Sequence, residues 1–323
     1  MQVRTSILFL TCHFFFVSIW GQSDYPSLDL HNRQIKMIIY PPDVENGFYR
    51  AARFDWAGVI GSLQFKNHQY IEHWLDRHDP TNFESATGPV EGFAPIGYEE
   101  SKPGDPFLII GVGLLKKVDN KPYHFSVPYE FVDHGKWHTE KSKRKVEMTQ
   151  VITSPIGWGY DYTKTIRLNG NKAGFYLHHR LKNSGSKPLE TTVYNHNFFI
   201  IDHEPTGPNI QTRFPYAAQA EGKGFGDLIV IQDSTMNFSR QLQRGENVYT
   251  SDITTKRNKP GDYDIFIENL KSKVGVEITA DRPLHRLAYW ACHSTACPEP
   301  FLEIKLQPGE VYEWTIEYRL YEY

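Results

Sequence analysis

The sequence predicts an all-β protein built as a large antiparallel β-sandwich with few helices. Beyond about residue 145, short segments of alternating apolar and polar residues follow one another and are separated by turn sequences. No window of helical length carries a sustained apolar repeat of three to four residues, apart from weak candidates such as 70–75. Aromatic residues, which favour strands, make up 14% of the chain.

Ten segments are predicted as strands because each is bounded by turn residues. Two of them, 160–168 and 311–320, alternate with period two, which indicates a strand with one buried face. The turns at 169–171 and 307–309 carry glycine for a positive φ and asparagine or proline for the corner. The region 47–143 is less regular and is expected to supply long loops and the first strands. The predicted strands are 145–152, 160–168, 174–181, 189–201, 228–232, 263–267, 274–279, 285–291, 301–306 and 311–320.

Composition and charge exclude several classes of protein. The chain has 35 basic and 38 acidic side chains and a net charge of −3, which argues against a nucleic-acid binder. Its 40% hydrophobic and 23% charged residues are globular values, not those of a disordered chain. After the N-terminal segment, no stretch approaches the roughly 18 apolar residues of a membrane span. Because no linker-like shift in composition interrupts 23–323, this region is predicted to form a single sandwich domain.

The first 22 residues are predicted to be a secretory signal peptide. Arg4 is followed by an apolar run over 6–20 and by small or polar residues at 21–23, where cleavage is expected. We therefore expect the mature protein to be secreted or periplasmic.

Removal of this segment leaves two cysteines, Cys292 and Cys297. In an oxidising compartment they could form a disulfide, and the alternative is two buried thiols on neighbouring strands. A zinc site is disfavoured, because only His293 lies nearby and no second ligand pair has suitable spacing.

Two segments carry side chains suited to acid–base chemistry. His196 lies between two asparagines and precedes two phenylalanines, so it is either an oriented acid or a hydrogen-bonded core histidine. Glu299 lies between two prolines, which stiffen the backbone and remove two donors. We therefore expect Glu299 at a fixed point outside a paired strand, either as a general base or as a solvated turn residue.

The early region holds two further clusters. Arg50, Arg53 and Trp56 could bind hydroxyls or a carboxylate and stack on a sugar face, although an edge-strand salt bridge explains the arginines equally well. The histidines at 68, 73 and 78 are five residues apart, which does not place them on one face of a helix or strand, so metal binding is disfavoured.

Together these pieces resemble the aldose 1-epimerase (galactose mutarotase-like) superfamily. Residues 181–189 are similar to the family's N-x-G-x-x-P-L turn, and 194–199 to the N-H-x-Y-F strand that follows it. The Cys-Pro-Glu-Pro segment at 297–300 and the turn at 306–310 are similar to the family's E-P segment and its L-x-P-G-E turn. The resemblance covers about residues 35–323 and is strongest around these motifs.

The resemblance implies a large galactose mutarotase-like sandwich with a sugar cleft on one face. It also implies an isomerase that interconverts sugar anomers by ring opening, with Glu299 as general base, His196 as general acid and no cofactor. The base takes the proton of the anomeric hydroxyl while the acid protonates the ring oxygen, so we expect the two groups to face the sugar from opposite sides. Ordinary pKa values of about 4 and 6.5 suggest a carboxylate paired with an imidazole that supplies the proton.

The early region departs from the family pattern. Members often carry a histidine in an H-G-G segment, whereas 87–93 has none, so a missing sugar contact would fall to His68, His73 or Glu91. The arginine that grips sugar hydroxyls would match Arg50 or Arg53. The expected substrate-binding residues are Arg50, Arg53, Trp56, Asn195, His73 and Glu91.

Two other functions stay open from the sequence. One is a noncatalytic carbohydrate-binding protein on the same fold, and the other is a polysaccharide lyase or hydrolase. A glycoside hydrolase usually needs two carboxylates, and Glu299 is the only one that the sequence singles out. In each case the expected partner is a mono- or oligosaccharide.

Overall fold

The computed structural model describes residues 25–254 and 260–323, and the predicted signal peptide over 1–22 lies outside them. Their regular structure is nearly all β-strand, and the named strands pair in antiparallel fashion, so the predicted fold class is confirmed. The helical elements of this part of the chain are two short 3-10 turns, η1 (Ile201–His203) and η2 (Pro260–Asp262). Among the described residues we find no helix with the length and apolarity that crossing a membrane requires.

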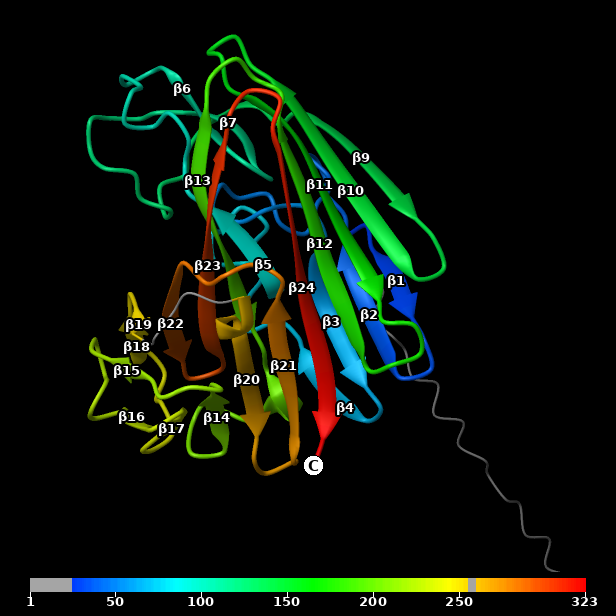
Figure 1. Ribbon diagram of the computed structural model, residues 1–323, viewed down its shortest axis with the longest axis vertical. Helices are drawn as coiled ribbons and strands as arrows, with labels where there is room; N and C mark the ends of the chain where they lie inside the picture. The colour runs from blue at the N-terminus through cyan, green and yellow to red at the C-terminus, as the bar shows by residue number, and fades with distance from the viewer. Residues whose placement is uncertain (1–24, 255–259) are drawn as a thin grey trace, which may run out of the picture.

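A ten-stranded sheet forms one layer of the sandwich (Figure 1). In spatial order its strands are β16 (Ile229–Gln232), β17 (Thr235–Phe238), β14 (Ile210–Arg213), β20 (Asp264–Asn269), β21 (Val274–Ala280), β24 (Val311–Glu322), β12 (Gly174–Asn183), β11 (Gly159–Leu168), β10 (Lys145–Thr153) and β9 (Lys136–Lys141). Buried residues alternate with more exposed ones along β10, β12 and much of β24, as the period-two pattern predicts.

A five-stranded sheet faces this layer. Its order is β18 (Asn247–Thr250), β22 (Arg286–Cys292), β23 (Ala296–Leu306), β13 (Leu189–Phe198) and β5 (Gly88–Phe93). Gly88 has a φ of +71°, and a Cβ there would lie 2.7 Å from the carbonyl oxygen of Ile60. Only glycine therefore fits where β5 begins.

Three smaller sheets come mostly from the irregular early region. The first has the order β1 (Leu28–His31), β2 (Ile35–Tyr40), β3 (Val59–Phe65) and β4 (His68–Ile71). The second has the order β6 (Pro106–Ile109), β7 (Gly113–Lys116) and β8 (Phe131–Asp133). The third pairs β15 (Gln219–Ala220) with β19 (Ile253–Thr254).

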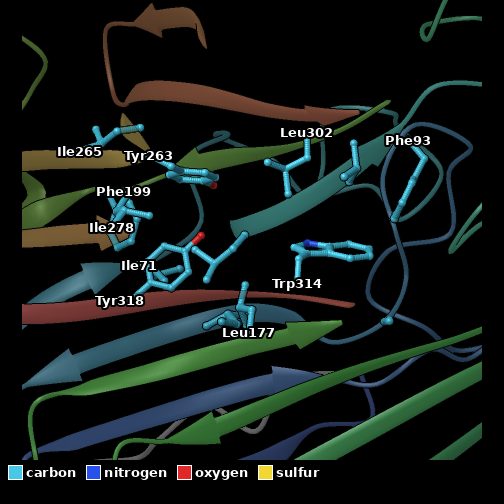
Figure 2. Close-up of a cluster of buried hydrophobic side chains, with 14 of the residues drawn as sticks. Ile71, Phe93, Leu177, Phe199, Tyr263, Ile265, Ile278, Leu302, Trp314 and Tyr318 are labelled. Carbon is cyan, nitrogen blue, oxygen red and sulfur yellow. The ribbon is translucent and has the colours of Figure 1, made fainter. Parts of the chain in front are cut away.

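The main core lies between the ten- and five-stranded sheets. Figure 2 shows Leu302 of β23 and Phe93 of β5 on one side of it, and Leu177 of β12 and Trp314 of β24 on the other. These side chains are at most 4% exposed, and the rings of Phe93 and Trp314 lie 6.4 Å apart. Packing of both inner faces stabilises the sandwich by removing apolar surface from water.

Most predicted strands agree with the structure to within a few residues, and two differ more. The strand predicted over 189–201 ends at Phe198, and η1 follows with Asp202 and His203 at positive φ. The strand predicted to start at 301 begins at Ala296.

Glu299 consequently lies within a paired strand, and the expectation that it lies outside one was wrong. It is paired with Ala288 of β22. The Phe301 carbonyl accepts a hydrogen bond from His285 on the β22 side, whereas the Pro298 carbonyl accepts one from the Asn197 side chain on the β13 side. The missing N–H groups of both prolines therefore face the side where β23 no longer pairs with β13, and no ladder bond is lost.

Both cysteines of this hairpin, Cys292 and Cys297, are buried and free. Of the two alternatives that the sequence left open, the structure shows the pair of thiols.

Candidate active site

A cleft of about 620 Å³ opens on the face of the five-stranded sheet that points away from the ten-stranded sheet. Strands of this sheet and loops from distant parts of the chain form its walls. It is lined by Arg53, Trp74, Glu84, Phe125, Tyr194, His196, Phe198, Lys223, Asn247, Tyr249, Trp290, Glu299 and Phe301.

Strand alternation explains why the candidate acid and base share this cleft. Tyr194, His196 and Phe198 are two residues apart on β13, so they point to the same face of the sheet. Glu299 and Phe301 do the same on β23. Because Tyr194 pairs with Phe301, the two rows of side chains lie next to each other. Two segments about 100 residues apart in the sequence therefore meet in one place.

His196 and Glu299 contact each other directly. The Nε2 of His196 lies 3.3 Å from the Oε1 of Glu299, and the two side chains are 2% and 9% exposed. The imidazole stacks on Phe198, with ring centroids 3.8 Å apart, and it lies in a T-shaped arrangement with Trp290, with centroids 5.6 Å apart. The expectation that the two groups face a sugar from opposite sides was wrong, because no sugar fits between atoms this close. A sugar in the cleft would meet both groups from the same side.

The environment reverses the usual order of the two pKa values. Burial raises the pKa of Glu299 to about 7, although the guanidinium groups of Arg53 and Arg286 favour the carboxylate. Burial, reinforced by the charge of Arg53, lowers the pKa of His196 well below its usual value. At neutral pH the imidazole is therefore uncharged, and the carboxyl group is poised between its two forms.

Arg53 reaches the cleft from the loop before β3. Its guanidinium lies 4.4 Å from the ring centre of Phe54 and 4.2 Å from that of Phe125, distances typical of cation–π contacts. Its Nε is buried and has no hydrogen-bond partner among the described residues. Of the two candidate arginines, the structure brings only Arg53 to this cleft, where it has a donor left for a ligand.

Asn195 and Glu91 face the interior of the sandwich, behind the cleft. The Glu91 carboxylate accepts hydrogen bonds from His179 at 2.8 Å and from Asn195 at 2.9 Å, and it pairs with Lys164. Lys164 also lies 3.7 Å from the carboxylate of Asp55. Glu91, His179 and Lys164 are fully buried and Asn195 is 2% exposed, so neither Glu91 nor Asn195 is placed to contact a ligand.

Trp56 and His73 do not line the cleft either. The Trp56 indole donates a hydrogen bond to the Ala51 carbonyl at 2.9 Å. The two ring nitrogens of His73 contact the Leu75 carbonyl at 2.7 Å and the His78 ring at 3.0 Å. Within 25–254 and 260–323, no three or more His, Cys, Asp or Glu side chains are arranged to hold a metal.

Much of the cleft wall was missed by the sequence interpretation. Trp74 stacks on Phe198 with ring centroids 5.2 Å apart, and it forms a T-shaped pair with Trp290, with centroids 5.6 Å apart. Glu84 and Tyr249 complete the wall from two other parts of the chain. None of these residues belongs to a local motif. The high aromatic content was the only signal for the tryptophans and Tyr249, and no sequence signal pointed to Glu84. Such an aromatic wall suits the apolar face of a sugar ring.

Comparison with known proteins supports the fold. The sequence matches no protein-family model and no curated protein. The structure is similar to a galactose mutarotase-like protein from Lactobacillus casei (TM-score 0.55, 14% identity, 92% of this chain and 100% of that chain). It is also similar to a galactose mutarotase related enzyme from Lactobacillus acidophilus (TM-score 0.56, 10% identity, 92% and 98%). A third similar structure is a GalM/aldose epimerase homologue from C. elegans (TM-score 0.51, 12% identity, 92% and 99%).

At sequence identities of 10–14%, the similarity to these structures identifies the fold of the chain. The chain has the galactose mutarotase-like fold, as the resemblance of its motifs predicted.

Proposed function

We propose that the protein is an exported sugar mutarotase, an aldose 1-epimerase-like isomerase that interconverts the anomers of a free sugar. The observation that carries this proposal is the contact of 3.3 Å between a buried carboxyl group and an imidazole in an aromatic-lined cleft. The fold, which is shared with proteins described as mutarotase-like, supports the same activity.

In this mechanism the Glu299 carboxylate takes the proton from the anomeric hydroxyl. The bond between C1 and the ring oxygen breaks while the Nε2–H of the neutral His196 donates a hydrogen bond to that oxygen, and the proton gained by Glu299 is relayed through Nε2 to the oxygen, so that the imidazole stays neutral. The open-chain sugar rotates about the bond next to C1, and reversal of the steps closes the ring as the other anomer. Because Glu299 lies 3.3 Å from Nε2, the proton that it gained can pass back to the imidazole, and no cofactor is needed to balance the protons.

The rest of the cleft would hold the sugar. Arg53 can donate hydrogen bonds to ring hydroxyls, and Trp74 and Trp290 offer surfaces for the apolar face. A neutral His196 acts as a hydrogen-bond donor that needs no positive charge, in the way that a histidine of lowered pKa can polarise oxygen in other enzymes.

Polarimetry tests the proposal. Freshly dissolved α-anomers of glucose, galactose, mannose and xylose should reach equilibrium faster with the protein than without it, for at least one sugar. Binding of both anomers without any acceleration would instead identify a noncatalytic carbohydrate-binding protein.

The pH dependence of kcat/KM is a separate prediction. Glu299 acts as a base only when ionised, and its pKa is raised to about 7. We therefore expect kcat/KM to rise about tenfold per pH unit below pH 7 and to level off above it. Because the pKa of His196 is lowered well below its usual value, titration of this imidazole causes no further change in kcat/KM near neutral pH. A rate that is constant between about pH 5 and 8 would contradict this assignment.

A second candidate function has one observation in its favour. Glu84 lines the cleft together with Glu299, so the cleft offers the two carboxyl groups that glycoside hydrolysis usually requires. A hydrolase would release new reducing ends from an oligosaccharide, whereas a mutarotase would leave the chain length unchanged.

A further inference from the structure

A second pocket of about 480 Å³ adjoins the cleft. The two cavities share the loop over 50–53 as a wall, because Arg50, Ala51 and Ala52 line the pocket and Arg53 lines the cleft. They also meet where Phe83 of the pocket packs against Phe125 of the cleft, with ring centroids 5.7 Å apart. The cavities are therefore neighbours, and a ligand of two linked units that occupies both would cross the ridge that Arg53, Phe83 and Phe125 form between them.

The pocket carries the charge of one cation, Arg50, and no acidic residue lines it. Burial lowers the pKa of His134, so this imidazole adds a polar group and no charge at neutral pH. The guanidinium of Arg50 donates one hydrogen bond to the backbone carbonyl of Glu45 at 2.8 Å and forms no ion pair with a carboxylate in the described part of the chain. The cleft differs, because Arg53 and Lys223 there are balanced by Glu84 and Glu299.

Two buried polar atoms of the pocket residues have no partner. They are Nε of Arg50 and Nδ1 of His134, and neither has a hydrogen bond within the described residues. Buried polar groups are almost always paired with protein groups or ordered water, so these two atoms leave hydrogen-bonding capacity beside the pocket that the described residues do not use. A planar carboxylate matches the geometry of a guanidinium better than a neutral hydroxyl does.

The remaining walls suit a sugar ring. His134 stacks on Phe131, with ring centroids 4.4 Å apart, and Phe131 lies 5.4 Å from the ring of Trp56. Thr81 and Ser126 add hydroxyl groups that can bond to sugar hydroxyls. Aromatic rings with a few polar groups are typical of a carbohydrate site.

We propose that this pocket binds an acidic sugar unit through its carboxylate, with Arg50 as the ligand of that carboxylate, while the sugar linked to it occupies the cleft. The substrate class is then an acidic oligosaccharide with a free reducing end. This inference rests on the proposed function in one respect, namely that the cleft holds a sugar.

Matched disaccharides test the pocket by isothermal titration calorimetry. The probes are two pairs of disaccharides: cellobiouronic acid with cellobiose, which differ in one carboxylate, and digalacturonic acid with α-1,4-galactobiose, which differ in one carboxylate on each unit. In at least one pair the acidic member should bind wild-type protein about 10-fold or more tightly than its neutral partner. The variant Arg50→Gln should lose this preference, Arg50→Lys should keep part of it, and Arg33→Gln, which removes an exposed arginine in the turn between β1 and β2, should keep all of it.

The outcomes separate this proposal from the proposed function. If neither acidic disaccharide binds more tightly than its neutral partner, or if Arg50→Gln keeps the preference, the pocket proposal is wrong, whatever the mutarotation rate. If wild-type protein prefers the acidic member but does not accelerate mutarotation, the pocket stands and the mutarotase assignment fails. A preference that inorganic sulfate abolishes only in wild-type protein would further support an anion held by Arg50.

Discussion

Glu299→Gln is expected to lower the catalysed rate of mutarotation by about 10²- to 10⁴-fold, which is the usual contribution of a general base. The amide has the shape of the carboxylic acid but cannot accept the proton of the anomeric hydroxyl. Polarimetry on the sugar that wild-type protein accelerates most is the measurement. The matched control is Glu303→Gln, on the same strand but exposed and paired with Lys305 at 2.9 Å, which should leave the rate unchanged. An unaltered rate in Glu299→Gln would end the assignment.

The same variant should also reveal that the carboxyl group is desolvated. In an unfolded chain a glutamate titrates near pH ~4.3, whereas the folded protein raises the pKa of Glu299 to about 7. The fold therefore favours the protonated form, and the stability contributed by Glu299 is present at low pH and is lost as the pH rises to about 7. Relative to Glu299→Gln, wild-type protein should lose up to about 3 kcal/mol of unfolding free energy between about pH 4 and 8. A difference that does not change with pH would contradict the raised pKa.

Lys164→Met is expected to lower the free energy of unfolding by about 3–5 kcal/mol, because it leaves the buried carboxylate of Glu91 without its cationic partner. Burial alone would raise the pKa of Glu91, but Lys164 and His179 outweigh it and lower that pKa to about 2. Urea unfolding at neutral pH measures the loss. Adding Glu91→Gln to this variant should recover part of it, because the unpaired charge is then removed.

Lys145→Met is the control for this prediction. Lys145 pairs with Glu147 at 2.9 Å, but both side chains are about a third or more exposed, and such pairs contribute at most about 1 kcal/mol. A loss of stability in Lys164→Met that is no larger than in Lys145→Met would contradict the pairing of Lys164 with a buried, ionised Glu91.

The fold was predictable because strand patterns are local. Segments such as 160–168 and 311–320 alternate with period two, and burial on one face follows directly from that alternation. The early region was not predicted in this detail, since its strands are short and their pairing depends on partners far away in the chain. The prediction that the Pro-Glu-Pro segment places Glu299 outside a paired strand was wrong for a related reason. Whether a proline disrupts a strand depends on which side its missing N–H faces, and only the neighbouring strands decide that.

The site was predictable only in part. The resemblance of the motifs predicted His196 and Glu299, and these two residues meet in the cleft. It also predicted that either Arg50 or Arg53 binds sugar hydroxyls, and of these two Arg53 lines the cleft. Glu91 and Asn195 were expected there too, but both point inward, because adjacent residues of a strand face opposite sides of the sheet. Trp74, Trp290 and Glu84 come from separate segments whose proximity no short sequence pattern encodes.

From its amino-acid order alone, this chain could be identified as all-β and as carrying the two residues on which the proposed chemistry depends. The tertiary structure determines the distance between these two residues and the charge in the neighbouring pocket. It also reverses the order of their pKa values, because burial raises that of Glu299 and lowers that of His196. The reason is physical. Alternation and turn residues act over a few positions, whereas burial and the approach of charges depend on which distant strands and loops pack together.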